Sequence, residues 1–166
     1  MRSLPLRMLA LAGLAFAPVS ISHLQMKGPF DLLPTTVRVL DQPRVDRRLF
    51  ALRRFFERIA CPVREYSELF IDVADLYHLD WRLLPSLSYV ESGCGKAVHN
   101  NNLFGWDSGR AVYESPASSI RQVGYCLAHS RLYRWKDVDA LLAAYNGDPD
   151  YAFAVKSIMQ RIAPAR

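Results

Sequence analysis

Residues 80–106 decide the fold, and they read DWRLLPSLSYVESGCGKAVHNNNLFGW. The first half, through Ser92, has apolar residues at the three-or-four spacing that is typical of a helix with a buried face. Gly93 and Gly95 end that helix, because glycine accepts the left-handed backbone found where helices stop. The polar residues 96–114 follow, rich in Asn and Gly, and they predict a loop or short irregular strands.

Helical spacing continues on both sides of this stretch, and no internal repeat is present. The pattern predicts further helices over residues 44–59, over 64–80, from Ser115-Pro116 onward, over 138–145 and over 151–162. The fold class is therefore mainly α. We expect a small orthogonal bundle with one irregular lobe inserted after the helix that residues 80–92 form.

The first 22 residues predict an exported protein. Two arginines precede a short apolar run over residues 8–20, which is well below the roughly 20 residues that span a bilayer. We interpret residues 1–22 as a secretory signal peptide; the alternative is an uncleaved anchor. Residues 23–43, punctuated by prolines, predict a linker, so residues 44–163 form one domain of a periplasmic or secreted protein with no stable membrane span.

The charge balance favours an anionic polymer as partner. The net charge is +5 for the whole chain, and residues 23–166 carry 19 basic against 16 acidic residues. This mild excess suits a cell wall, whereas proteins that bind nucleic acid concentrate their charge more heavily. The arginines of residues 44–58 suggest a membrane-binding or nucleic-acid-binding helix. We rank that hypothesis last, because the acidic segment over residues 65–75 predicts internal neutralisation.

The three cysteines are Cys61, Cys94 and Cys126. In an exported chain they permit one disulfide with three possible pairings, which leaves one thiol over. No Cys or His residues have the spacing of a metal site, so the sequence implies no metal and no organic cofactor.

Glu91 is the most informative polar residue. Leu84, Leu87 and Glu91 share the face that their helix buries, and burial disfavours a carboxylate. Glu91 also lies in the last helical turn, where the helix dipole opposes negative charge. Both effects raise its pKa, as a general acid at neutral pH requires. Spacing alone does not decide between this interpretation and a second one, in which Glu91 caps a loop or pairs with a surface arginine.

The segment YVESGCGKAVHNNNLFGW, residues 89–106, resembles the signature of lysozyme-like peptidoglycan-cleaving enzymes, the bacterial lytic transglycosylases and glucosaminidase-domain proteins. Their pattern is an apolar helix that ends in Glu-Ser-x-x-Gly-Lys, then an Asn-rich loop and a Phe-Gly or Trp-Gly turn. The resemblance continues upstream over residues 66–92 and downstream in AAYNGDPDYAFAVKSIMQRI, residues 143–162. It covers roughly residues 44–163 and implies a lysozyme-like fold.

The resemblance implies that Glu91 is the catalytic acid, which protonates the glycosidic oxygen of a β-1,4 bond. Tyr145 matches the tyrosine that orients the acid by a hydrogen bond, and Asn146 follows it as a substrate-binding candidate. Tyr151 matches the aromatic residue that opens the last helix, and we expect it to pack in the core.

Four residues are expected to bind substrate: Asn102, Trp106, Asn146 and Glu114. The amide of Asn102 offers a donor and an acceptor to N-acetyl groups. Trp106 either stacks on a sugar face or packs in the interior. Glu114 and Asp107 are the candidates for the second carboxylate that the usual glycosidases need.

The chain departs from the family pattern in two places. Cys94 replaces a large apolar residue, so it either loosens the packing behind Glu91 or forms a disulfide, with Cys126 as the suggested partner. The Gly-Leu-Met-Gln run of the transglycosylases is replaced by NNLFGW, which favours the glucosaminidase-like branch of the family. A lytic transglycosylase needs no second carboxylate, so both reactions remain open. The alternative function is a non-catalytic module that binds peptidoglycan on the same fold.

Overall fold

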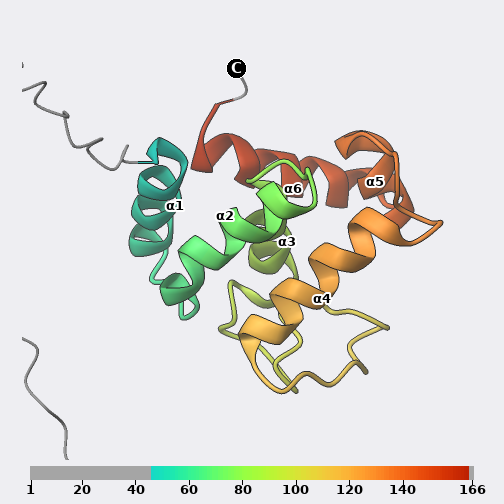
Figure 1. Cartoon of the computed structure of the whole chain (residues 1–166), viewed down its shortest axis with the longest axis horizontal. Coiled ribbons are helices and arrows are strands. Elements are labelled where there is room, and N and C mark those ends of the chain that lie inside the picture. Colours follow the sequence, from blue (N-terminus) through green and yellow to red (C-terminus); the bar gives the residue numbers. More distant parts are fainter. Residues whose placement is uncertain (1–45, 165–166) are drawn as a thin grey trace, which may run out of the picture. The chain divides into compact units, whose positions relative to one another are not determined.

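The computed structural model describes residues 46–164, which form a helical bundle (Figure 1). The expected signal peptide (1–22) and linker (23–43) lie outside these residues. The helices are α1 (Arg47–Arg58), the 3-10 helix η1 (Arg64–Tyr66), α2 (Ser67–Leu76), α3 (Leu83–Ser92), α4 (Pro116–His129), α5 (Val138–Tyr145) and α6 (Pro149–Ile162). Residues 46–164 contain no β-strand, so the mainly α prediction is confirmed for this part of the chain.

Helix α3 occupies the centre of the bundle (Figure 1). Seven of its ten residues are buried, among them Leu83, Leu84 and Leu87. It packs against α6 more extensively than against α2. Just before α3, the Arg82 guanidinium donates a hydrogen bond to the carbonyl oxygen of Ala163, 2.9 Å away, just after α6. The rest of the bundle therefore determines where the last turn of α3 lies.

Helix α3 begins later than the sequence predicts. Asp80 accepts a hydrogen bond from the Arg82 backbone N–H at 2.9 Å and pairs with the Arg82 guanidinium at 2.6 Å. Asp80 therefore belongs to a short turn before α3, and the helix predicted over residues 80–92 begins at Leu83. Pro85 lies in the first turn, where its missing N–H has no partner to lose. Gly93 ends the helix with φ +61°, as predicted.

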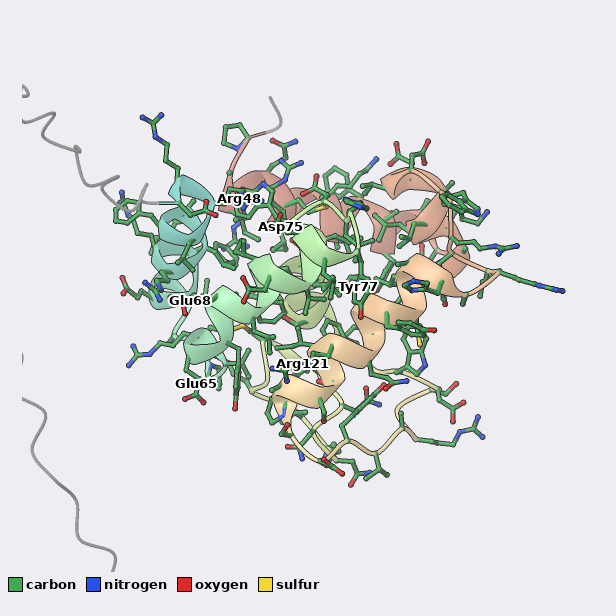
Figure 2. The ribbon with its side chains drawn as sticks, viewed as in Figure 1. Arg48, Glu65, Glu68, Asp75, Tyr77 and Arg121 are labelled. Atoms are coloured by element: carbon green, nitrogen blue, oxygen red, sulfur yellow. A yellow bond between two sulfur atoms is a disulfide. The ribbon has the colours of Figure 1, made fainter. Side chains whose placement is uncertain are left out.

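Ion pairs between α1 and α2 confirm part of the predicted neutralisation. The Arg48 guanidinium donates to both carboxylate oxygens of Asp75, at 2.6 and 2.8 Å, and Figure 2 shows the two residues facing each other. Arg53 pairs with Glu68 at 2.7 Å. Two of the arginines of α1 are therefore neutralised by acids of α2.

Helix α4 begins at a capping box, as its Ser-Pro opening predicts. Ser115 and Ser118 each accept the other's backbone N–H, and Pro116 occupies the first helical position. Further along, Gly124 lies directly against Val73 of α2, so closely that a Cβ at Gly124 would collide with the valine side chain. The crossing of α2 and α4 therefore requires the smallest residue at this point.

Cys94 forms a disulfide with Cys61, and their Cα atoms are 5.5 Å apart. The suggested Cys94–Cys126 pairing is therefore wrong. Gly93 and Cys94 both have positive φ, which turns the chain after α3 back toward the connection between α1 and η1. Cys126 is left as a partly buried free thiol on α4. The disulfide lies within the core, since both of its cysteines are buried.

We expect the Cys61→Ala/Cys94→Ala variant to lose about 3 kcal/mol of its free energy of unfolding, because the disulfide closes a loop of roughly 30 residues. Urea denaturation followed by circular dichroism measures this. Cys126→Ala is the matched control and should change the free energy of unfolding by less than about 1 kcal/mol. Equal stability of the double variant and the unmodified chain would contradict the prediction.

Candidate active site

Glu91 lies in the wall of an open cleft of about 690 Å³. The end of α3, the loop over residues 104–108, the connection from α4 to α5 and the end of α5 together form the cleft. Its lining residues are Glu91, Phe104, Gly105, Trp106, Asp107, Ser108, Ser130, Leu132, Tyr133, Tyr145 and Asn146.

The Glu91 carboxyl group is held on two sides. The Tyr151 hydroxyl donates a hydrogen bond to Oε1 at 2.6 Å. On the other side, Gly105 lies so near that a Cβ there would approach Oε2 to 2.6 Å. Because Gly105 has φ +60°, glycine suits both the backbone conformation and the close approach. Oε1 is thus engaged by the tyrosine, and Oε2 lies at the part of the cleft that Gly105 lines.

Burial raises the pKa of Glu91 above its ordinary value, and the hydrogen bond from Tyr151 acts in the opposite direction. Burial and the contact with Glu91 raise the pKa of Tyr151 far above its ordinary range, so the phenol stays protonated and can donate. A half-buried carboxyl with a fixed donor at one oxygen is suited to general acid chemistry.

The hydrogen bond that we expected from Tyr145 comes from Tyr151 instead. The Tyr145 hydroxyl donates to the carbonyl oxygen of Phe104 at 2.6 Å. The rings of Tyr145 and Tyr151 stack, with centroids 6.0 Å apart and planes inclined by 10°. Tyr151 lies in the first turn of α6, the helix that packs along α3, and this brings its hydroxyl to Glu91. Tyr145 therefore holds the loop and supports the tyrosine that contacts the acid.

Trp106 belongs to an aromatic wall of the cleft. Its ring centroid lies 5.8 Å from that of Tyr133 and 5.9 Å from that of Tyr145. The ring is half-buried and also lines the cleft. The packing role that we considered is therefore present, and the ring also borders the space that a ligand would occupy.

The polar residues of the signature build the loop that carries Gly105. Asn102 is buried; its amide donates to the Trp106 carbonyl oxygen and accepts from the Trp106 backbone N–H, both at 2.9 Å. The Ser92 hydroxyl lies 2.9 Å from the Leu103 carbonyl oxygen and accepts from the Gly95 N–H at 3.0 Å. Asn102 thus closes the loop and does not line the cleft, although we expected it to bind substrate.

The remaining candidates divide between the cleft and the outer surface. Asn146 lines the cleft, and its side-chain oxygen accepts the Asp148 backbone N–H at 3.0 Å. Asp107 also lines the cleft and pairs with Arg110 at 2.8 Å. Glu114 is exposed and is not among the lining residues, so the structure does not bring it to Glu91.

The interpretation of the sequence missed the contacts of Tyr151 and Gly105 with Glu91. It also missed the second wall of the cleft, to which Ser130, Leu132 and Tyr133 contribute. The only local signal for Tyr151 is its place at the start of a helix, where an aromatic residue packs as readily as it binds. The Phe-Gly turn indicated that Gly105 is structurally important. Its contact with Glu91 could not be predicted, because nothing in the sequence indicates that these two segments meet.

Within residues 46–164, no group of three or more His, Cys, Asp or Glu side chains is arranged to hold a metal ion. In the same part of the chain, none of the helices has the length and apolar character needed to cross a bilayer. No protein-family model, curated protein or solved structure matches the chain.

We expect Gly105→Ala to destabilise the protein more than Gly109→Ala does. Both glycines have positive φ, so alanine strains the backbone at either position by about 1 kcal/mol. Only the Cβ at Gly105 collides with Glu91, which adds roughly 1–3 kcal/mol; the space around Gly109 is open. Urea denaturation measures the free energy of unfolding of both variants.

A double-mutant cycle isolates the contact between Gly105 and Glu91. In a Glu91→Ala background the carboxyl group is absent, so Gly105→Ala should cost no more than Gly109→Ala. An equally large cost with and without Glu91 would show that the two residues do not press on each other.

Proposed function

We propose that this chain is an exported enzyme that cleaves β-1,4-glycosidic bonds in the glycan strands of peptidoglycan, with Glu91 as the general acid. The observation that carries the proposal is the Glu91 carboxyl group, half-buried in an open cleft and held between Tyr151 and Gly105. The ordered resemblance of residues 44–163 to lysozyme-like enzymes supplies the substrate class. It also supplies the expectation of a lysozyme-like arrangement of the helices.

In the proposed reaction, protonated Glu91 donates its proton from Oε2, beside Gly105, to the glycosidic oxygen as the bond to the anomeric carbon breaks. The developing carboxylate is stabilised by the hydrogen bond that Tyr151 donates to Oε1. Tyr151 is therefore a positioning residue, and Tyr145 supports it through the stacked rings. Burial raises the pKa of Glu91, which favours the protonated form that a general acid needs.

The cleft suits a polymer that passes through it. It is open to solvent, and it combines the aromatic ring of Trp106 with polar groups from Ser108, Ser130 and Asn146. Sugars present apolar faces and hydroxyl edges, so a wall of this composition is able to contact both.

Two reaction routes are compatible with the carboxylates of the cleft. Apart from Glu91, Asp107 is the only acidic residue among the lining side chains. A hydrolase would use Asp107 as nucleophile or as the base for water. A lytic transglycosylase would use Glu91 alone, with the N-acetyl and 6-hydroxyl groups of the substrate completing the reaction. Glu114 is not among the lining residues of the cleft, so neither route assigns it a role in this proposal.

We expect Glu91→Gln to lower the rate of fragment release from purified cell-wall sacculi by roughly 10²–10⁴-fold, since glutamine cannot donate the proton. Mass spectrometry of the released fragments measures the rate and identifies the ends. Anhydro-muramic ends would indicate a transglycosylase, and reducing ends would indicate a hydrolase that uses Asp107. Unchanged release by a folded Glu91→Gln variant would refute the proposed role of Glu91.

Asp107→Asn is the companion variant for the second carboxylate. It should stop a hydrolase and leave a transglycosylase nearly unaffected. If the unmodified chain sediments with sacculi and releases nothing, the proposed activity is wrong and the fold serves wall binding.

The pH profile of Tyr151→Phe tests the positioning role. The tyrosine donates to the charged form of Glu91 and so lowers its pKa; removing the hydroxyl group therefore raises that pKa. Activity needs the protonated acid, so the alkaline limb of the profile should move to higher pH. The maximal rate should fall by about tenfold, because the carboxyl group loses its fixed partner.

Tyr145→Phe is the matched control for this profile. It removes one tyrosine hydroxyl group from the same stack and leaves the hydrogen bond between Tyr151 and Glu91 in place. Its alkaline limb should stay where it is in the unmodified chain. A shift of equal size in both variants would show that the tyrosines act only through the general packing of the site.

A further inference from the structure

The outer face of α1 and the end of α6 carry arginines that form no ion pair with the acids of residues 46–164. Arg47, Arg54 and Arg58 recur at spacings of seven and four residues, which places them on one face of α1, and Arg161 of α6 lies next to them. We call these four residues the arginine stripe. The ion pairs within residues 46–164 involve other basic residues, such as Arg48 and Arg53, and none involves the stripe.

Aromatic rings contact three of the four guanidinium groups of the stripe, those of Arg54, Arg58 and Arg161. Arg58 and Arg161 lie over the ring of Phe55, at 5.9 and 5.6 Å from its centroid, and Arg161 also lies 5.7 Å from the centroid of Tyr89. Arg54 lies 5.7 Å from the ring of Phe50. A cation–π contact fixes the position of an arginine without cancelling its charge. Arg54, Arg58 and Arg161 are therefore positioned by aromatic rings while, among residues 46–164, no ion pair neutralises them.

Two hollows run along the stripe and meet at Ala51. One, of about 310 Å³, lies between α1 and α6 and is lined by Phe50, Ala51, Arg54, Arg58, Arg161 and Ile162. The other, of about 460 Å³, is lined by Arg47, Arg48, Ala51, Trp81, Arg82, Ala163 and Pro164. In the second hollow Arg48 and Arg82 are paired with acids, which leaves Arg47 as its unpaired arginine. The first hollow has Arg54, Arg58 and Arg161 in its lining and no acidic residue, so it suits phosphate groups, which arginine binds with two parallel hydrogen bonds.

We propose that the arginine stripe is a docking surface for an anionic phospholipid bilayer. Charge complementarity favours this partner, because lipid headgroups offer a dense layer of phosphates to several arginines at once. Phe50, at 58% exposure, lines the same hollow as Arg54 and Arg58. An exposed aromatic residue among cations is typical of helices that lie in the membrane interface. Glu91 is in contact with Tyr151, about 15 Å along α6 from Arg161 by helix rise, so docking leaves the cleft free.

The test compares binding of the full chain to vesicles of phosphatidylcholine alone and to vesicles that also contain phosphatidylglycerol. Co-sedimentation at low salt measures the difference. The first 22 residues, with Arg2 and Arg7, are the same in the unmodified chain and in every variant, so a change between variants reports the stripe. The unmodified chain should bind the anionic vesicles more tightly, and added salt should remove the difference.

The stripe variant Arg47→Gln/Arg54→Gln/Arg58→Gln should lose roughly 100-fold of this preference, since each arginine near an anionic surface contributes about fivefold. The control Arg64→Gln/Arg121→Gln/Arg131→Gln removes the same charge from other exposed arginines that form no ion pair within residues 46–164, and it should change the preference by only a few-fold. The variant Arg47→Lys/Arg54→Lys/Arg58→Lys should keep most of the preference. If the glutamine variant fails to fold, the lysine variant still measures how binding depends on these three positions.

Three results would overturn the proposal. One is an equal loss in the stripe variant and the control, which would mean that net charge alone acts. Another is equal binding of the unmodified chain to both kinds of vesicle. The third is binding to sacculi or DNA that depends on the stripe, without a preference for anionic vesicles. Release of fragments from sacculi should be the same in the stripe variant, so failure here is separable from failure of the proposed catalytic activity.

Discussion

The burial of α3 is the constraint on which the rest of the structure depends. Its apolar residues are covered by the surrounding helices, so the helix cannot shift or rotate without exposing them. Glu91 extends from the last turn of this fixed helix, at the boundary between the core and an open cleft. Its carboxyl group is therefore partly desolvated, which raises its pKa, and still borders a space that a substrate is able to enter.

Further contacts fix the loop after α3 relative to that helix. Ser92 and Tyr145 fix the backbone at Leu103 and Phe104, and Asn102 closes the turn onto Trp106. These polar groups contact the protein's own backbone, so a signature rich in Asn and Ser builds the cleft wall. The disulfide of the preceding turn reinforces the same region from the side of α1. Hydrogen bonds thus fix the loop at the site, and its backbone has little freedom to rearrange.

Most of the fold was predictable because its signals are local. Helix α4 begins where the Ser-Pro pair predicts, α5 covers the predicted residues 138–145, and Gly93 ends α3 as expected. Helical period and capping involve residues within a few positions of each other, so a single sequence contains them. The start of α3 was misplaced because Asp80 has two uses, a helix cap or a turn, and a contact with distant Ala163 accompanies the turn.

The sequence by itself determined the mainly α class, the approximate positions of the helices and the place of Glu91 in the last turn of a buried helix. Only the tertiary structure decided that Tyr151 contacts Glu91, that Cys61 is the partner of Cys94, and that Glu114 lies outside the cleft. Each of these facts depends on the angle between helices or the path of a loop. Those are set by the summed packing of segments far apart in the chain, which no local spacing encodes.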